Sequence, residues 1–183
     1  MHRTLALISS LAALACALGA LGCSSNGSGG GSQGCSSATV SFSKDVIPVF
    51  EMSCTLSHVC HGQMGNSAEE NLYLGGNTSE MTMTDVQAVY KGLVGVTAKE
   101  DTSMKLVTAD DPQSSYLFHK VHDDQATLNS TLGNACMATN SMCSNCNSGF
   151  GPCGATMPYS GTQLPSGSLC TIQNWIQQGA QNN

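Results

Sequence analysis

Basic residues are scarce in this sequence. The 183-residue chain has six lysines and arginines against twelve acidic residues, a net charge of -6, and Arg3 is its only arginine. Proteins that bind nucleic acid neutralise phosphates with clustered Lys and Arg side chains, and polybasic segments bind anionic lipid in the same way. The sequence therefore excludes nucleic acid as a partner, and it excludes a polybasic membrane-binding surface.

Charged and aromatic residues are also few. They make up 10% and 5% of the chain, whereas about 25% of an average soluble domain is charged. The polar surface must therefore consist mostly of uncharged side chains. The length suits one domain of ordinary size. No paired carboxylates, phosphate-cradling loop or lipase-type nucleophile motif is visible, so we do not expect an enzyme.

Residues 1–22 have the pattern of a secretory signal peptide. A short polar start precedes an apolar run over residues 5–21, which is too short for a good membrane-spanning helix. The run ends Ala20-Leu21-Gly22-Cys23, which resembles the signal of bacterial lipoproteins. We expect lipidation at Cys23, which would anchor the chain in the bacterial cell envelope, at the outer membrane. Cys16 lies too early in the apolar run to compete, and an ordinary cleaved signal is the alternative.

Residues 23–41 are rich in Ser and Gly. A segment of this composition cannot bury apolar surface and behaves as a flexible coil. We therefore expect a tether here, between the lipidated cysteine and a folded domain over residues 42–180.

Eight cysteines remain when the two within residues 1–23 are set aside. An even number in an exported chain indicates disulfides, although the count alone does not give their connectivity. The spacing favours a Cys54–Cys60 bond and bonds within a central cluster, which leaves Cys35 and Cys170 as a pair by elimination. Zinc binding by the central cluster is an alternative that oxidising conditions disfavour. That cluster consists of Cys136, Cys143, Cys146 and Cys153.

Apolar residues at helical spacing predict four helices with little strand, and hence an all-α fold. The first helix covers residues 41–54 with Ser43 as its N-cap. The second covers residues 84–94 with Thr84 as its N-cap. Both helices would pack an apolar face against the rest of the domain.

The second half of the domain contains the other two predicted helices. One covers residues 110–121 and opens with Asp followed by Pro112. The closing helix covers residues 169–178, capped by Ser166 or Ser168. Between them, residues 123–156 are rich in Asn, Ser and Gly, which predicts a long loop or a disulfide-stapled, cysteine-rich insertion.

One set of cysteine, histidine and methionine residues has the chemistry to hold a cofactor. Cys54 ends the first helix, Cys60-His61-Gly62 follows, Met157-Pro158 comes far downstream, and the closing helix contains Trp175. This order resembles that of exported bacterial c-type cytochrome domains, over residues 42–180. The resemblance implies a small cytochrome c-like helical domain that binds haem c and transfers electrons. It also implies haem thioethers at Cys54 and Cys60, with His61 and Met157 as ligands of the haem iron.

The spacing of the two cysteines departs from the pattern of that family. Five residues separate Cys54 from Cys60, where the family has two. The three extra residues must bulge outward if both thiols are to reach one haem. The alternative is a haem-free, disulfide-stabilised binding or structural module of the cell envelope, in which Cys54 and Cys60 are joined to each other. The sequence identifies neither a redox partner nor a ligand.

Overall fold

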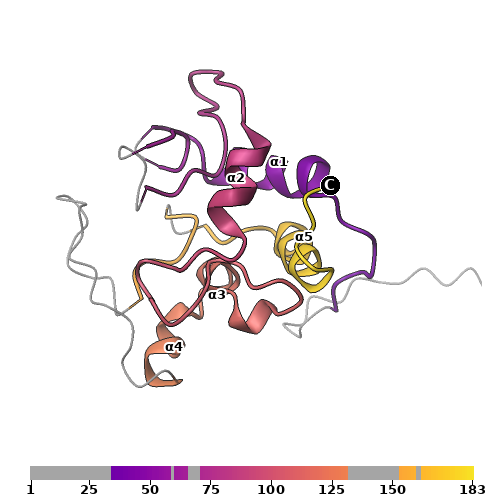
Figure 1. The fold of residues 1–183 in the computed structure, drawn as a ribbon, viewed down its shortest axis with the longest axis vertical. Coiled ribbons are helices and arrows are strands. Elements are labelled where there is room, and N and C mark those ends of the chain that lie inside the picture. The colour runs from indigo at the N-terminus through magenta and orange to yellow at the C-terminus, as the bar shows by residue number, and fades with distance from the viewer. Residues whose placement is uncertain (1–33, 59, 66–70, 132–152, 160–161) are drawn as a thin grey trace, which may run out of the picture. The chain divides into compact units, whose positions relative to one another are not determined.

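The computed structural model describes residues 34–58, 60–65, 71–131, 153–159 and 162–183. Within these residues the fold is all-α, as predicted: it consists of helices and three isolated β-bridges, without a strand. None of the helices in the described ranges is long and apolar enough to cross a membrane. In chain order they are η1 (Phe42–Val46), α1 (Ile47–Ser53), α2 (Val86–Leu93), η3 (Pro112–Ser114), α3 (Tyr116–His122), α4 (Gln125–Thr131) and α5 (Ser166–Gln177) (Figure 1).

The first predicted helix is present as η1 followed directly by α1. Its N-cap is Ser41, not Ser43 as predicted, because the Ser41 hydroxyl accepts from the Lys44 N–H at 3.3 Å. In return, the Asp45 carboxylate accepts from the Ser41 N–H at 2.7 Å. This reciprocal arrangement satisfies two of the N–H groups that the start of a helix leaves unpaired.

Two of the later helices also have N-caps other than the predicted residues. Asp85 caps α2 by accepting from the Ala88 N–H at 3.0 Å, because the Thr84 hydroxyl already accepts from the Gly76 N–H at 2.8 Å. In the third predicted helix, an Asp followed by Pro112 opens the helix as predicted: Asp111 caps η3, although α3 begins only at Tyr116. The N-cap of α5 is Pro165, without a side-chain bond, so neither predicted serine caps that helix.

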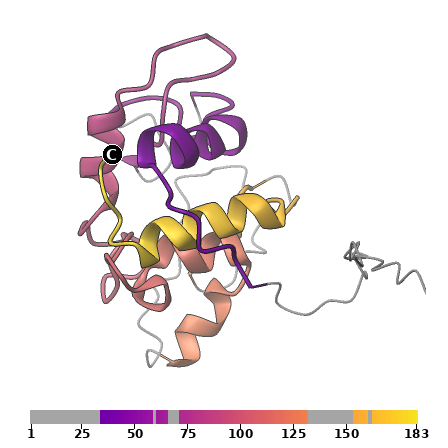
Figure 2. The same ribbon diagram turned by 90° about the vertical axis from the view of Figure 1, so that its right-hand side faces the viewer.

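The core forms where α5 packs against η1 on one side and against α3 on the other (Figures 1 and 2). The rings of Trp175 and Phe42 are both 0% exposed and stack with centroids 4.8 Å apart. Tyr90 of α2 adds an edge-on contact to Phe42 at 5.5 Å. The fully buried members of this core include Phe42, Val46, Phe50, Val89, Leu93, Val107, Ile172, Trp175 and Ile176.

Residues 34–41 belong to the folded unit, which begins at Gly34 and not at the predicted Phe42. Cys35 and Cys170 form the disulfide that elimination left for them. The Gln178 side chain accepts from the Val40 N–H at 2.9 Å and donates to the Ala38 carbonyl at 2.8 Å. Composition does not reveal this docking, because Gln178, directly after α5, binds the backbone of the segment rather than its side chains.

The predicted loop over residues 123–156 contains helix α4. Asp123, in the left-handed conformation with φ 62°, ends α3 and turns the chain into it. Leu128 is buried at 7% exposure in a small second core with Ala98, Met104, Tyr116 and Cys153. This burial stabilises a helix of seven residues that its polar sequence would not form alone. Cys153 is disulfide-bonded, whereas Cys136, Cys143, Cys146 and the predicted lipidation residue Cys23 lie outside the described residues.

Candidate functional site

A backbone hydrogen bond closes the segment that contains the two cysteines and the histidine. The His61 N–H donates to the Cys54 carbonyl at 3.0 Å. In an α-helical turn the same bond joins residues four apart, and here it joins residues seven apart. The extra residues are displaced toward solvent, with Leu56 53% exposed and the His58 side chain 60% exposed. The long spacing is therefore accommodated by an outward bulge.

The bulge is packed tightly at its base. Buried Thr55 donates from its hydroxyl to the Glu51 carbonyl at 3.2 Å, and its own carbonyl accepts from the Thr78 N–H at 3.2 Å. A Cβ at Gly62 would lie 2.9 Å from the carbonyl oxygens of both Thr55 and Ser57. Glycine after the histidine thus allows the backbone at residue 62 to pass close to the carbonyl groups of Thr55 and Ser57 in the bulge.

Cys54 and Cys60 are free thiols in the structure, so the disulfide predicted from their spacing is not formed. Both are partly buried, and the Ser57 hydroxyl donates to the Cys60 sulfur at 3.2 Å. Burial raises the pKa of Cys54 to about 12, with a smaller contribution from the charge of nearby Cys60. Near neutral pH Cys54 is therefore a protonated thiol that is close to a second thiol.

The His61 ring is fixed by a second stretch of chain. The side chain is buried, and its Nδ1 lies 2.9 Å from the Leu72 carbonyl, while the Leu74 N–H donates to the His61 carbonyl at 2.9 Å. A carbonyl only accepts, so the proton is on Nδ1 and the lone pair is on Nε2. This is the arrangement in which a histidine is oriented to bind a metal through Nε2.

Burial favours the neutral form of the His61 ring. Burial is the largest influence and lowers the pKa of His61 from its ordinary value of 6.5. The hydrogen bond to the Leu72 carbonyl raises the pKa in opposition. The charges of Lys120 and Glu100 have smaller effects, which lower and raise the pKa respectively. The neutral ring is the form that keeps the Nε2 lone pair available.

We expect the haem-free chain to lose stability as the pH falls below about 6.5. In the unfolded chain His61 takes up a proton near that pH, whereas in the folded chain it does so only at lower pH. Unfolding therefore binds a proton, and the free energy of unfolding falls by up to about 1.4 kcal/mol per pH unit until the folded-state pKa is reached. Urea denaturation at several pH values measures this slope.

The control for this prediction compares two histidines. His61→Gln removes the titrating group and should flatten the slope, whereas His58→Gln removes an exposed imidazole and should leave it unchanged. His122, whose pKa burial also lowers, contributes equally in both variants. A slope that is the same in His61→Gln as in the wild type would contradict the prediction.

Met157 is held against α3. Its N–H donates to the Lys120 carbonyl at 2.8 Å. Four residues earlier, the Cys153 carbonyl accepts from the Lys120 ammonium at 3.3 Å. The structure thus brings Cys54, Cys60 and His61 together in one loop. Met157 is placed on another segment, whose backbone is bonded to Lys120 of α3.

A buried ion pair anchors the Met157 segment. Lys120 and Glu100 are 2.9 Å apart with side chains 8% and 15% exposed, and the Tyr116 hydroxyl donates to the same Glu100 oxygen at 2.6 Å. Sequence reasoning missed these residues, because one lysine and one glutamate 20 positions apart form no motif. The available signal was Lys120 itself, one of six basic residues, placed in a helix whose apolar residues Leu117, Phe118 and Val121 face the core.

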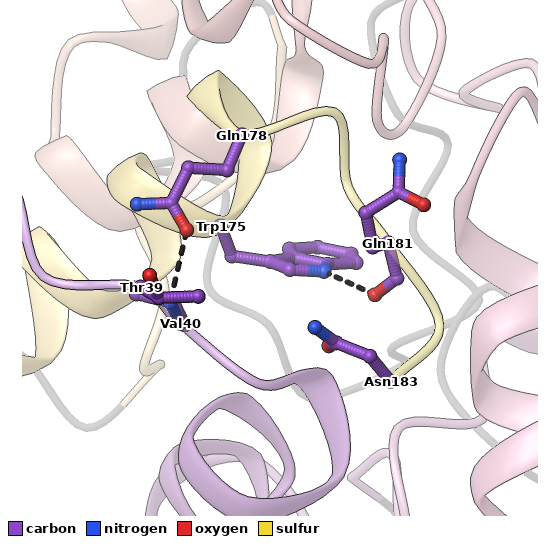
Figure 3. Close-up of a pocket in the computed structure, with 6 residues that line it drawn as sticks. All are labelled: Thr39, Val40, Trp175, Gln178, Gln181 and Asn183. Carbon is purple, nitrogen blue, oxygen red and sulfur yellow. Dashed lines mark hydrogen bonds between the residues drawn. The ribbon is translucent and has the colours of Figure 1, made fainter.

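A separate pocket lies where residues 39–40 meet the end of α5 (Figure 3). In it the Trp175 indole N–H donates to the Gln181 carbonyl at 2.9 Å, so the polar atom of the ring is already paired. None of the predicted haem ligands lines it. Its lining residues are Thr39, Val40, Trp175, Gln178, Gln181 and Asn183.

Comparison of the chain with models of protein families, with curated proteins and with solved structures finds no match. Nor do the described residues contain a group of three or more His, Cys, Asp or Glu side chains able to hold a metal ion. Function must therefore be argued from the site itself.

Proposed function

We propose that this chain is an exported, lipid-anchored electron-transfer protein with a cytochrome c-like domain that binds one haem covalently. In this proposal Cys54 and Cys60 would attach the haem, and His61 and Met157 would bind its iron. One observation carries the proposal: the His61 N–H to Cys54 carbonyl bond, which closes the long loop as a helical turn would close a shorter one.

The side chains present fit a haem. Attachment needs two free thiols close to one histidine, and Cys54 and Cys60 are both free. The iron ligand must be a neutral imidazole with a free Nε2, which the Leu72 carbonyl selects at His61 by accepting from Nδ1 at 2.9 Å. When bound, the haem would supply a reversible one-electron couple at its iron.

The chain's own residues would orient and shield this group. The Leu72–Leu74 segment fixes the histidine ring through both side-chain and backbone bonds. The bond from Met157 to the Lys120 carbonyl fixes the position from which the second ligand extends. The haem-free alternative has less support, because it predicts a Cys54–Cys60 disulfide where the structure has two thiols.

The proposed location rests on the sequence. A Ser/Gly-rich stretch of ten residues, 24–33, separates Cys23 from Gly34, where the folded unit begins. These ten residues lie outside the described residues, and their composition predicts a coil that would span roughly 17 Å root-mean-square and hold the domain close to a membrane surface. We propose anchoring at the outer membrane through lipid on Cys23.

Expression in a bacterium that matures c-type cytochromes tests the haem proposal. We expect a Soret band, covalent haem staining on a denaturing gel, and an intact mass increased by one haem. The Cys54→Ala/Cys60→Ala variant should lose covalent haem completely, and either single variant should keep at most one thioether. Colourless wild-type protein without the added mass would refute the proposal.

Matched variants separate ligands from neighbours. His61→Ala should lose its axial-ligand spectrum, whereas His58→Ala, in the exposed bulge three residues earlier, should keep it. Met157→Ala should change the reduction potential and the spectrum of the oxidised protein. Met83→Ala, at a residue 93% exposed, should change neither. If His58→Ala had the same effect as His61→Ala, His61 would not be a ligand of the iron. If Met83→Ala had the same effect as Met157→Ala, Met157 would not be one.

The anchoring proposal has its own test. Cys23→Ala should move the protein from the membrane fraction to the soluble fraction and remove the lipid mass, because acyl chains supply the membrane affinity. Cys16→Ala lies within the predicted signal and should leave the protein membrane-bound. Unchanged fractionation of Cys23→Ala would exclude Cys23 as the anchor.

A further inference from the structure

Exposed apolar side chains are concentrated in one part of the chain. Among the described residues seven large hydrophobic side chains are exposed, and five of them lie between positions 52 and 83. Soluble proteins rarely expose several such side chains near one another unless the surface binds a partner. Methionine is frequent on such surfaces, because its flexible side chain adapts to different contacts. The five residues are Met52, Leu56, Met64, Met81 and Met83.

The two segments that contain these five residues are bonded to each other. The chain from α1 to Met64 contains three of them, and the loop that precedes α2 contains two. The Thr78 N–H donates to the Thr55 carbonyl at 3.2 Å, and the Thr84 hydroxyl donates to the Glu51 carboxylate. In both views α1 and this loop lie at the end of the domain opposite α4 (Figures 1 and 2). The five exposed side chains therefore belong to one end of the domain.

The loop that precedes α2 holds its methionines on a bonded backbone. The Asn77 N–H donates to the Thr82 hydroxyl at 2.6 Å, and the Thr82 N–H donates to the Asn77 carbonyl at 3.1 Å. Met81, within this turn, has a φ of 53°, a left-handed conformation that residues other than glycine seldom adopt. Surrounding contacts must hold such a conformation in place. The exposure of Met81 and Met83, 89% and 93%, thus belongs to a built turn, which loses little freedom when a partner binds.

The same stretch of chain is acidic. Residues 45–90 contain six acidic residues and no lysine or arginine, whereas the part of the domain that follows has six acidic residues and four lysines. Asp45, Glu80 and Asp85 of this stretch are exposed. The net negative charge of the domain therefore comes mainly from the segments that contain the exposed apolar residues.

This charge selects the occupant of the surface. A second copy of the chain would place acidic groups against acidic groups, and anionic lipid headgroups would be repelled in the same way. A protein that surrounds an apolar contact with lysine and arginine complements the surface in both respects. We propose that Met52, Leu56, Met64, Met81 and Met83 form the docking surface for a basic partner protein. The proposal requires no haem and is independent of the proposed function.

Methyl NMR of the chain, labelled at the methionine methyl carbons, tests this surface. The probe is a small soluble cytochrome c with a lysine-rich surface, added in its reduced, diamagnetic form. We expect the resonances of Met52, Met64, Met81 and Met83 to shift, and that of Met104, buried at 8%, to stay in place. Binding should weaken by at least about tenfold when the salt is raised to about 1 M, where the Debye length is about 3 Å. An acidic protein of the same size should cause no shift.

Matched variants locate the surface. Glu80→Gln should weaken binding of the probe by at least about threefold, whereas Asp110→Asn makes the same charge change at an exposed residue outside the stretch and should leave it unchanged. Met81→Gln/Met83→Gln should weaken binding by at least about tenfold, because it removes apolar contact without changing charge. Val96→Gln, at one of the two exposed apolar residues outside the surface, should have no effect. Surface changes of this kind leave the chain folded, so each result is interpretable.

Three results would overturn the proposal. The first is the absence of methionine shifts with the basic probe, and the second is equal weakening in Glu80→Gln and Asp110→Asn. The third is a set of the same shifts produced by anionic vesicles or by raising the concentration of the chain alone, which would assign the surface to a membrane or to a second copy.

Discussion

Replacing Cys35 and Cys170 by serine should lower the free energy of unfolding by about 2–5 kcal/mol. Their disulfide joins residues 135 positions apart and so closes almost the whole folded unit into one loop. In the chain-entropy model a loop longer than about 100 residues gives close to 5 kcal/mol, because the open unfolded chain has many more conformations. Urea denaturation of the variant and the wild type measures the difference.

Single and double variants provide the control for this prediction. Cys35→Ser and Cys170→Ser each break the same bond. Either single change should therefore lower the free energy of unfolding by about as much as both together. Hydrogen exchange at the Val40 amide, which donates to Gln178, should also become faster because the segment that contains it is released. A double variant within about 0.5 kcal/mol of the wild type would show that the disulfide does not constrain the unfolded chain.

Lys120→Met should lower the free energy of unfolding by about 3–5 kcal/mol. The change removes the cation 2.9 Å from Glu100 and leaves that carboxylate buried, with the Tyr116 hydroxyl still donating to it. The cost arises from the unpaired buried charge and not from the lost attraction alone. Glu100→Gln should also lower the free energy of unfolding, because it leaves the Lys120 ammonium buried without its carboxylate. The double variant, which leaves neither charge, should lose clearly less stability than the sum of the two single variants. Urea denaturation of the four proteins gives this coupling.

An exposed pair on the same protein is the matched control. His58 and Glu80 lie 3.9 Å apart with side chains 60% and 59% exposed. Breaking that pair with Glu80→Gln should change stability by less than about 1 kcal/mol, because water screens it. In addition, Lys120→Met should speed hydrogen exchange at the Met157 amide, since the pair anchors that segment. Additive single-variant effects would contradict the proposed pairing.

The local pattern of the sequence was sufficient to locate the main helices. Phe42, Val46 and Phe50 recur at helical spacing, and the helix they predict exists with these residues buried. The Asp cap before Pro112 was placed correctly. The caps of the first two helices were misplaced by one or two residues, because several Ser, Thr and Asp side chains near each helix start compete for the same N–H groups. Thr84 was excluded as a cap by its bond to Gly76, eight residues earlier, which no local pattern shows.

The candidate site, too, could be predicted from the sequence only in its local part. Cys60, His61 and Gly62 are adjacent in the chain, so the sequence shows their association with Cys54 at short range. That the intervening residues bulge outward depends on the Thr55–Thr78 and His61–Leu72 bonds, which join separate loops. The Lys120–Glu100 pair beside the Met157 segment is likewise formed only when α3 packs against a distant loop.

By itself, the sequence determined that the chain is poor in basic residues, helical in its core, and equipped with two cysteines and a histidine in one short segment. These are consequences of composition and of neighbours within a few residues. Only the tertiary structure decided that Cys54 and Cys60 are not joined to each other, that the Leu72 carbonyl holds the proton on Nδ1 of His61, and that residues 34–41 dock on the end of α5. Each of these depends on a hydrogen bond or on burial between segments that the linear order keeps apart.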